Sequence, residues 1–131
     1  MTTLRVPQVA EVLGVSTDTV RRWVDRGLLP DQHDAAGRRV VDGAALAAVL
    51  RAQRHLDADG RSSARNRLPG IVTDVVRDGV MAQVELQAGP FRLVSLMSRE
   101  AADELGLAPG VLAEAVVKAT VVVVERAGAG A

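Results

Sequence analysis

The 131-residue sequence contains no cysteine, which excludes disulfide bonds, thiolate catalysis and metal sites built on cysteine ligands. It has one Trp, one Phe and no Tyr, so its core must be aliphatic. The apolar runs are too short for a signal peptide or a membrane span, and we therefore expect a cytoplasmic protein without a membrane partner. The only histidines, His33 and His55, lie in polar segments away from paired carboxylates. We expect neither a bare metal cation nor a catalytic constellation, and hence no enzyme.

The sequence has no excess of positive or negative charge, because 16 basic residues balance 16 acidic ones. The balance differs between the two halves. Residues 1–56 hold eight basic and six acidic residues, whereas residues 57–131 hold eight and ten. The sign of this difference suits a nucleic-acid partner for the first half, although its size does not establish one.

The pattern of apolar residues changes near residue 60. Before it these residues recur at helical spacing, and after it they alternate or form valine-rich runs. The junction is polar and contains Gly and Ser, which is typical of a linker. We therefore expect an α+β protein of two small domains at residues 1–55 and 63–127, with a linker at 56–62 and a frayed tail at 128–131.

The first half predicts a helix-turn-helix. A helix is expected over residues 6–13, Gly14 interrupts it, and Ser16 is a suitable N-cap for a second helix over residues 17–26. A loop, a possible two-stranded wing near residues 37–41 and a third helix over residues 43–54 should follow.

A recognition helix enters the major groove of DNA with its N-terminal residues, and a wing contacts the phosphate backbone. The candidates for DNA contact therefore lie at the start of the second helix and in the wing. They are Thr17, Thr19, Arg21, Arg22, Arg38 and Arg39. The alternative is that these arginines are only solvated surface charges.

Four motifs carry a family resemblance in this half, namely VPQVA at 6–10, LGVS at 13–16, TVRRW at 19–23 and GLLP at 27–30. Over roughly residues 3–54 the chain resembles the winged helix-turn-helix of the MerR and excisionase families. The resemblance implies operator DNA as a partner. No long dimerising helix fits before residue 63, however, so dimerisation would have to come from the second half.

The second half predicts a five-stranded, OB-like β-barrel with one short helix. Turn signals occur at Asp78-Gly79, Gly89-Pro90 and Pro109-Gly110, and Ser98 should cap the helix, which ends before Gly106. The strands are expected at residues 71–76, 80–86, 91–97, 111–117 and 120–125.

Three further motifs, SSARNRLPG at 62–70, LGLAPG at 105–110 and VKAT at 117–120, resemble the Mop (molbindin, or TOBE-type) domain of molybdate-binding proteins. The resemblance implies a bound molybdate or tungstate oxyanion. The family's ligand positions fall on Ser63, Ala64, Arg65, Asn66, Ser98, Lys118, Ala119 and Thr120. Backbone N–H groups with one or two cations suit a dianion.

The same resemblance places the anion between subunits, so Ser63 and Arg65 of one chain are expected to meet Lys118 of another. It implies a homo-oligomer, either a dimer or a trimer of dimers. The leading hypothesis is a molybdate-responsive transcription regulator that binds DNA. The alternatives are a molybdate storage or delivery protein whose first domain serves assembly, and a DNA-binding protein whose barrel binds another ligand or only oligomerises.

Overall fold

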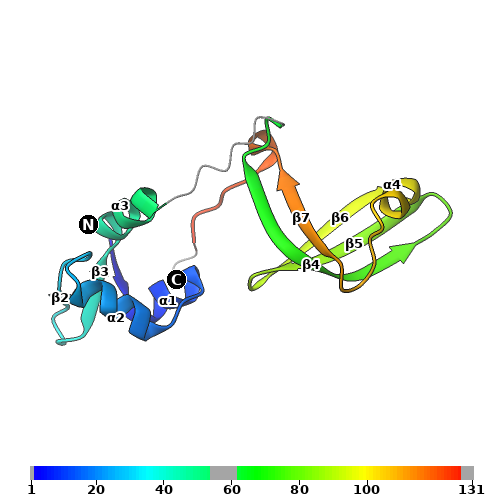
Figure 1. The fold of residues 1–131 in the computed structure, drawn as a ribbon. Coiled ribbons are helices and arrows are strands. Elements are labelled where there is room, and N and C mark those ends of the chain that lie inside the picture. Colours follow the sequence, from blue (N-terminus) through cyan, green and yellow to red (C-terminus); the bar gives the residue numbers. More distant parts are fainter. Residues whose placement is uncertain (1, 54–61, 128–131) are drawn as a thin grey trace. The chain divides into compact units, whose positions relative to one another are not determined.

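The structure is a computed structural model, which describes residues 2–53 and 62–127. It divides into two compact units, Met1–Asp57 and Ala58–Ala131, which we describe separately (Figure 1). The division falls within the expected linker at 56–62. Residues 56–61 of that linker, Arg54 of the expected third helix and the expected tail at 128–131 lie outside the described residues.

The first unit combines three helices with a small antiparallel sheet. The elements are β1 (Thr3–Arg5), α1 (Val6–Leu13), α2 (Thr17–Asp25), β2 (Gln32–His33), β3 (Arg39–Asp42) and α3 (Gly43–Gln53). Strand β3 is central, with β1 and β2 on its two sides. The helices and the β2–β3 hairpin, which we call the wing, match the expected helix-turn-helix, whereas β1 was not expected.

Local chemistry sets the boundaries of these helices. Gly14 ends α1 with a φ of 68°, a left-handed conformation that glycine adopts without strain. The Ser16 hydroxyl oxygen accepts a hydrogen bond from the Thr19 N–H at 3.1 Å and so caps α2. Helix α2 ends at Asp25, and Arg26, expected within the helix, is its C-cap. Asp42 accepts from the Ala44 N–H at 3.2 Å at the start of α3.

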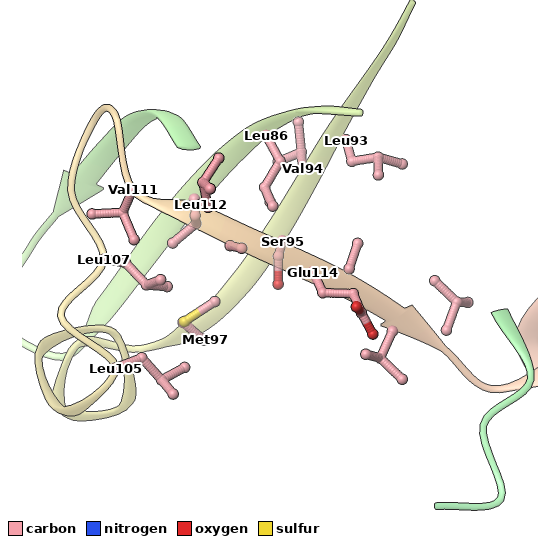
Figure 2. Close-up of a pocket in the computed structure, with 15 residues that line it drawn as sticks. Leu86, Leu93, Val94, Ser95, Met97, Leu105, Leu107, Val111, Leu112 and Glu114 are labelled. Carbon is pink, nitrogen blue, oxygen red and sulfur yellow. The ribbon is translucent and has the colours of Figure 1, made fainter. Parts of the chain in front are cut away.

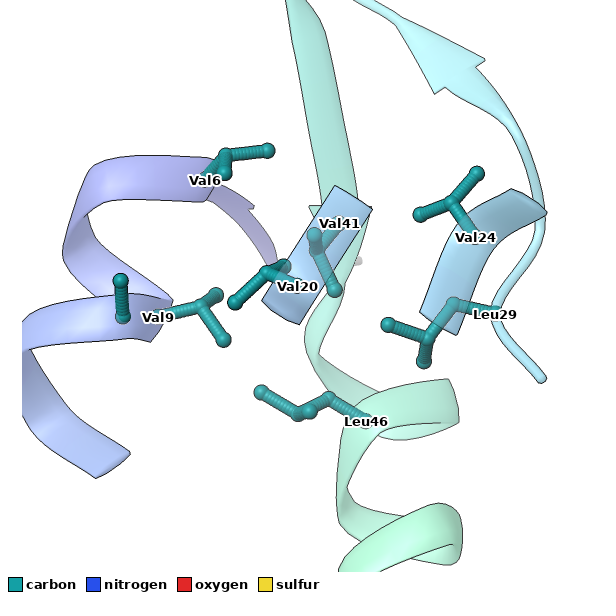
Figure 3. Packing of buried hydrophobic residues seen from close by; sticks show 8 residues of the cluster. Val6, Val9, Val20, Val24, Leu29, Val41 and Leu46 are labelled. Carbon is teal, nitrogen blue, oxygen red and sulfur yellow. The ribbon is translucent and has the colours of Figure 1, made fainter. Parts of the chain in front are cut away.

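One aliphatic core holds the first unit together (Figure 3). Its members come from α1, α2, the loop after α2, β3 and α3, and Val20 and Val41 are fully buried. The cluster consists of Val6, Val9, Ala10, Val20, Val24, Leu29, Val41 and Leu46. Trp23, the only tryptophan, packs against it. Burial of each large aliphatic side chain contributes about 1.5–3 kcal/mol, so this core fixes the position of α2.

The second unit is an antiparallel sheet with one short helix. Its elements are β4 (Asn66–Arg77), β5 (Met81–Ala88), β6 (Phe91–Ser98), α4 (Arg99–Glu104), β7 (Leu112–Val117) and a 3₁₀ turn (Ala119–Val121). The strand order is β6-β5-β4-β7. Strand β4 curves strongly, pairing with β7 in its first half and with β5 in its second (Figure 1).

The change of partner along β4 occurs at Ile71, which pairs with both β7 and β5. The residue before it is Gly70. A Cβ atom at this position would lie 2.5 Å from the backbone oxygen of Gln87 on β5. Only glycine allows the two backbones to approach so closely. Gly70 therefore shapes the bend that carries β4 from one partner to the other.

The expected strand count of five is wrong for the described residues, and a closed barrel is not shown within one chain. Within residues 62–127 the sheet has four strands and is open, with β6 and β7 as its edges. The segment 120–125, expected as the fifth strand, begins in a 3₁₀ turn and pairs with no other described strand. Its valines, Val121 to Val124, are exposed. A β-branched run favours extended backbone, but a strand also needs a neighbour for its hydrogen bonds.

The enclosed core of this unit is small. Its buried members are Val72, Val84, Leu86 and Leu107, from β4, β5 and the segment after α4. Ser98 caps α4 as expected, because its hydroxyl accepts from the Ala101 N–H at 3.1 Å. No helix in the described part of the chain is long and apolar enough to cross a membrane.

Candidate functional site

The first candidate site lies at the N-terminal end of α2. Arg21 and Arg22 are exposed there, and Thr17 and Thr19 are half-buried. The Arg21 Nη1 atom donates to Thr17 Oγ1 at 3.4 Å and to Asp18 Oδ1 at 3.2 Å. The Thr19 hydroxyl shares a 2.9 Å hydrogen bond with Ser16 and so belongs to the helix cap. Arg21 is therefore oriented by its own helix before any ligand binds.

The tip of the wing is organised by Asp34. Its carboxylate accepts from the backbone N–H groups of Ala36 and Arg38, both at 2.9 Å, and from Arg38 Nε at 3.0 Å. The hydrogen bond from the Arg38 backbone is the main cause that lowers the pKa of Asp34 below its ordinary value. Arg38 is exposed beside this turn. A charged carboxylate thus holds the wing tip in one conformation.

Arg39 links the wing to the end of α2. Its Nη1 atom lies 3.8 Å from Asp25 Oδ1, and its Nε atom lies 3.5 Å from Asp31 Oδ1. The side chain is half-buried and flanked by two carboxylates, so it is better placed to position the wing than to contact phosphate. The assignment of Arg39 to DNA contact stays a prediction.

Arg22 differs from the other predicted DNA-binding arginines, because its side chain has no hydrogen bond or ion pair with any residue in the ranges 2–53 and 62–127. Arg26, one helical turn further on, is also exposed and has no ion pair there. Arg26 is not among the DNA-binding residues predicted from the sequence, although its spacing of four from Arg22 places both on one side of a helix. These two cations are free to meet an external anion.

The second candidate site lies where β4 begins and β7 ends. Asn66 pairs with Val117 in the ladder, and its side-chain Nδ2 donates to the Val117 carbonyl oxygen at 3.0 Å. The segments 63–66 and 118–120 are therefore neighbours within one chain. The sequence-based expectation had placed Arg65 and Lys118 in different chains. That expectation stays a prediction, although the Asn66–Val117 pair brings the two segments close together within one chain.

Two cations at this end of the sheet, Arg65 and Lys118, have no carboxylate partner among residues 2–53 and 62–127. Arg67, Arg77, Arg92 and Arg99 of the same unit each form an ion pair with a carboxylate. Arg65 donates only to the Ser62 carbonyl oxygen, at 3.1 Å, and Lys118 has no ion pair within the described ranges. Both side chains are exposed. Two such cations beside turn backbone form a suitable environment for a small dianion.

Ser98 lies at the opposite end of the sheet. It pairs with Met81 at the far end of β5, next to the end of β4 at Arg77. Strand β4 is 12 residues long, so roughly 35–40 Å of strand separates this end from Asn66. The structure therefore does not bring Ser98 to the other predicted ligands within one chain.

A groove that was not predicted from the sequence lies between the two open edges of the sheet. It has a volume of ≈ 470 Å³ and is lined by β5, β6, β7 and the segment after α4 (Figure 2). Leu93 and Met97 of β6 face it, with Leu107 and Val111 beside them, and Glu114 is its only charged lining residue. The groove is therefore apolar, unlike the polar end formed by Arg65 and Lys118.

Among residues 2–53 and 62–127 there is no group of three or more His, Asp or Glu side chains that could hold a metal ion. The candidate sites are instead an exposed arginine surface on α2, a cationic end of the β4–β7 ladder and an apolar groove. None of these arrangements pairs a nucleophile with a base.

Comparison with family models gives two matches. Residues 62–129 match the TOBE domain, and residues 3–54 match a helix-turn-helix domain. The two matches support a fusion of these domains in one chain. Comparison with curated proteins gives no match.

Several solved structures are similar to the second unit. A molybdate-binding protein from Sporomusa ovata is 32% identical, with 50% of this chain and 98% of that chain covered and a TM-score of 0.49. MopII from Clostridium pasteurianum is 36% identical, with coverages of 50% and 98% and a TM-score of 0.47. The cytoplasmic molybdate-binding protein ModG, with molybdate bound, is 42% identical, with coverages of 49% and 47% and a TM-score of 0.44.

Proposed function

We propose, from the premise that this chain belongs to the TOBE domain family through residues 62–129, that it is a molybdate-responsive DNA-binding regulator. In this proposal the second unit binds molybdate or tungstate, and the helix-turn-helix unit binds an operator. The main support for this proposal is that one chain contains both the cationic end of the β4–β7 ladder and helix α2 with its exposed arginines.

The cationic end suits a tetrahedral dianion in both charge and donor type. Lys118 supplies a compact positive charge and Arg65 a planar fork of N–H donors. The segment 63–66 and the 3₁₀ turn at 119–121 add hydroxyl and backbone N–H groups. Charge-assisted hydrogen bonds of this kind contribute about 1.5–3 kcal/mol each. Ser63, Ala64, Arg65, Asn66, Lys118, Ala119 and Thr120 are the proposed ligands from one chain.

A second copy completes the anion site in this proposal. Ser98 cannot reach Arg65 or Lys118 of its own chain, because they lie at opposite ends of β4. Ser98 of one copy would therefore face the cationic end of another. An anion held by two copies stabilises the oligomer by mass action.

The open sheet supports the same assembly. Val121 to Val124 extend unpaired from the end of β7, while β6 and β7 leave two strand edges and an apolar groove between them. We infer that the 120–125 segment of a second copy enters this groove as the fifth strand and closes the barrel. Burial of a valine contributes about 1.5–3 kcal/mol, so reciprocal exchange of two such segments offsets an association cost of about 4–15 kcal/mol.

Isothermal titration calorimetry of the full chain with molybdate, tungstate and sulfate tests the anion site, with native mass measured before and after each titration. We expect heat from molybdate and tungstate and an increase in the oligomeric fraction. Lys118→Ala should weaken molybdate binding roughly 10- to 150-fold, because it removes one charge-assisted contact. Arg126→Ala is the matched control, since Arg126 is an exposed cation outside the site.

Absence of heat from molybdate and tungstate would contradict the anion-binding proposal. Equal loss of affinity in Lys118→Ala and Arg126→Ala would contradict the location of the site. A chain that binds molybdate but retains no DNA duplex would instead be a storage or delivery protein.

A further inference from the structure

The Asp18–Arg21 pair lies on the exposed side of α2, near its N-terminus. Arg21 Nη1 donates to Asp18 at 3.2 Å and to Thr17 at 3.4 Å. The two charged side chains are 52% and 82% exposed. An ion pair so open to water adds little to stability, so its main effect is to orient Arg21.

The hydrogen bonds of Arg21 leave one edge of its guanidinium free. Both contacts use Nη1, and Nε and Nη2 have no hydrogen-bond partner within residues 2–53 and 62–127. The Nε–Nη2 edge presents two parallel N–H donors in a fixed plane. In the major groove, guanine presents two acceptors, O6 and N7, at a spacing that such a fork matches.

We propose that Arg21, held by Thr17 and Asp18, reads a guanine in the major groove, and that Arg22 contacts the phosphate backbone. This assignment rests on the proposed DNA-binding function of the first unit. The two contacts bias the guanidinium toward one orientation, so Arg21 loses less side-chain entropy on binding than an unrestrained arginine would. Asp18 acts through Arg21 and is a positioning residue.

The carboxylate of Asp18 also favours a base over a phosphate as the ligand of Arg21. A phosphate that approaches the guanidinium is repelled by Asp18, 3.2 Å from Nη1. The edge of a guanine carries no net charge and suffers no such repulsion. Arg22 has no carboxylate partner in the described part of the chain, so nothing offsets its attraction to phosphate.

The test is a selection from a randomised 20-base-pair duplex library with the full chain, followed by binding titrations on the enriched sequence at several salt concentrations. The proposal expects an enriched motif with a guanine whose replacement weakens binding. Arg21→Ala should remove the preference at that base pair, which corresponds to a loss of roughly 5- to 150-fold in discrimination. Arg21→Lys should do the same while retaining affinity for unrelated duplexes, because Lys keeps the charge but lacks the fork.

Asp18→Asn should reduce the preference at the same base pair while increasing binding to unrelated duplexes. Arg22→Ala is the matched control. It should weaken binding to all duplex sequences alike and reduce the salt dependence of binding by about one phosphate contact. Circular dichroism melting verifies that each variant folds.

An enriched motif that Arg21→Ala leaves unchanged at every position would overturn this assignment but leave DNA binding intact. Binding of the library without any sequence preference would overturn it as well. Failure to retain any duplex would instead contradict the proposed DNA-binding function.

Discussion

The two units bury their apolar residues to different degrees. The first unit encloses Val20 and Val41 completely, and among its described residues only Val12 and Leu28 are large exposed hydrophobics. The second unit exposes apolar side chains on β4, β5, β6, β7 and the segment after β7. A unit of the first kind is complete as a single chain. The second leaves an apolar groove and a valine segment, which in our account fit one another in two copies.

The largest expected effect concerns the valine segment. The double change Val122→Asp with Val123→Asp should abolish dimerisation, weakening it at least about 100-fold, because the exchanged strand would have to bury carboxylates. Analytical ultracentrifugation over a range of concentrations measures this. Val12→Asp is the control, since Val12 is 76% exposed on the first unit. A double variant that dimerises like the wild type would refute the exchanged strand.

Gly70→Ala should destabilise the second unit alone, by about 1–3 kcal/mol or more, because its Cβ would overlap the Gln87 backbone. Gly79→Ala is the matched control, because a Cβ there meets nothing within 4 Å and its φ is not positive. Far-UV circular dichroism should show the lower stability of the second unit. The unfolding of the first unit, followed by Trp23 fluorescence, should be unchanged. Equal stability of the two variants would contradict the close approach of β4 and β5.

A core substitution in the first unit should destabilise that unit alone. Val20→Ala should lower its free energy of unfolding by about 2 kcal/mol, because it removes two methyl groups from a fully buried position. Trp23 fluorescence should then report a lower denaturation midpoint. Molybdate affinity should be unchanged, since Val20 belongs to the other unit. A shift of molybdate affinity together with the midpoint would show that the units do not fold independently.

The helix-turn-helix could be predicted from the sequence because its signals are local. Gly14 ends one helix and Ser16 caps the next, whatever surrounds them. Strand β1 was missed, because three residues beside a helix carry no alternating pattern long enough to recognise. Its pairing with β3 depends on residues 35–39 positions away in the sequence.

In the second unit, local sequence patterns predict strands but not the partners with which those strands pair. The β-branched run at 120–125 predicts a strand, but nothing in that run specifies the partner, and within one chain no partner is present among the described strands. The candidate ligands are a prediction from their motifs, which do not specify how the ligands are distributed over the sheet. Only the register shows that Asn66 pairs with Val117 at one end of the sheet, whereas Ser98 pairs with Met81 at the other.

A turn in each unit is held by an aspartate, Asp34 in the first unit and Asp78 in the second, and replacing either should change stability only slightly. The backbone N–H of Arg38 donates to Asp34, and the backbone N–H of Met81 donates to Asp78. These hydrogen bonds lower the pKa of each carboxyl below the ordinary 3.8. The resulting stabilisation is therefore present above that value and is lost as the pH falls through the lowered pKa. Asp34→Asn and Asp78→Asn should lower the melting temperature slightly at pH 7.

For both variants the difference from the wild type should persist down to about pH 5 and vanish in stronger acid. Trp23 fluorescence should report the effect of Asp34→Asn, and far-UV circular dichroism that of Asp78→Asn. A difference that stays constant down to pH 2 would show that the charge of the carboxylate is not responsible.

The central claim is that anion binding in one unit changes DNA binding by the other. Fluorescence anisotropy of the library-selected duplex, titrated with the full chain with and without saturating molybdate, measures this coupling directly. We expect a change in DNA affinity of roughly 5- to 150-fold, which should be absent with sulfate and lost in Lys118→Ala at the same molybdate concentration. Identical DNA affinity with and without molybdate, in a chain shown by calorimetry to be saturated, would contradict it.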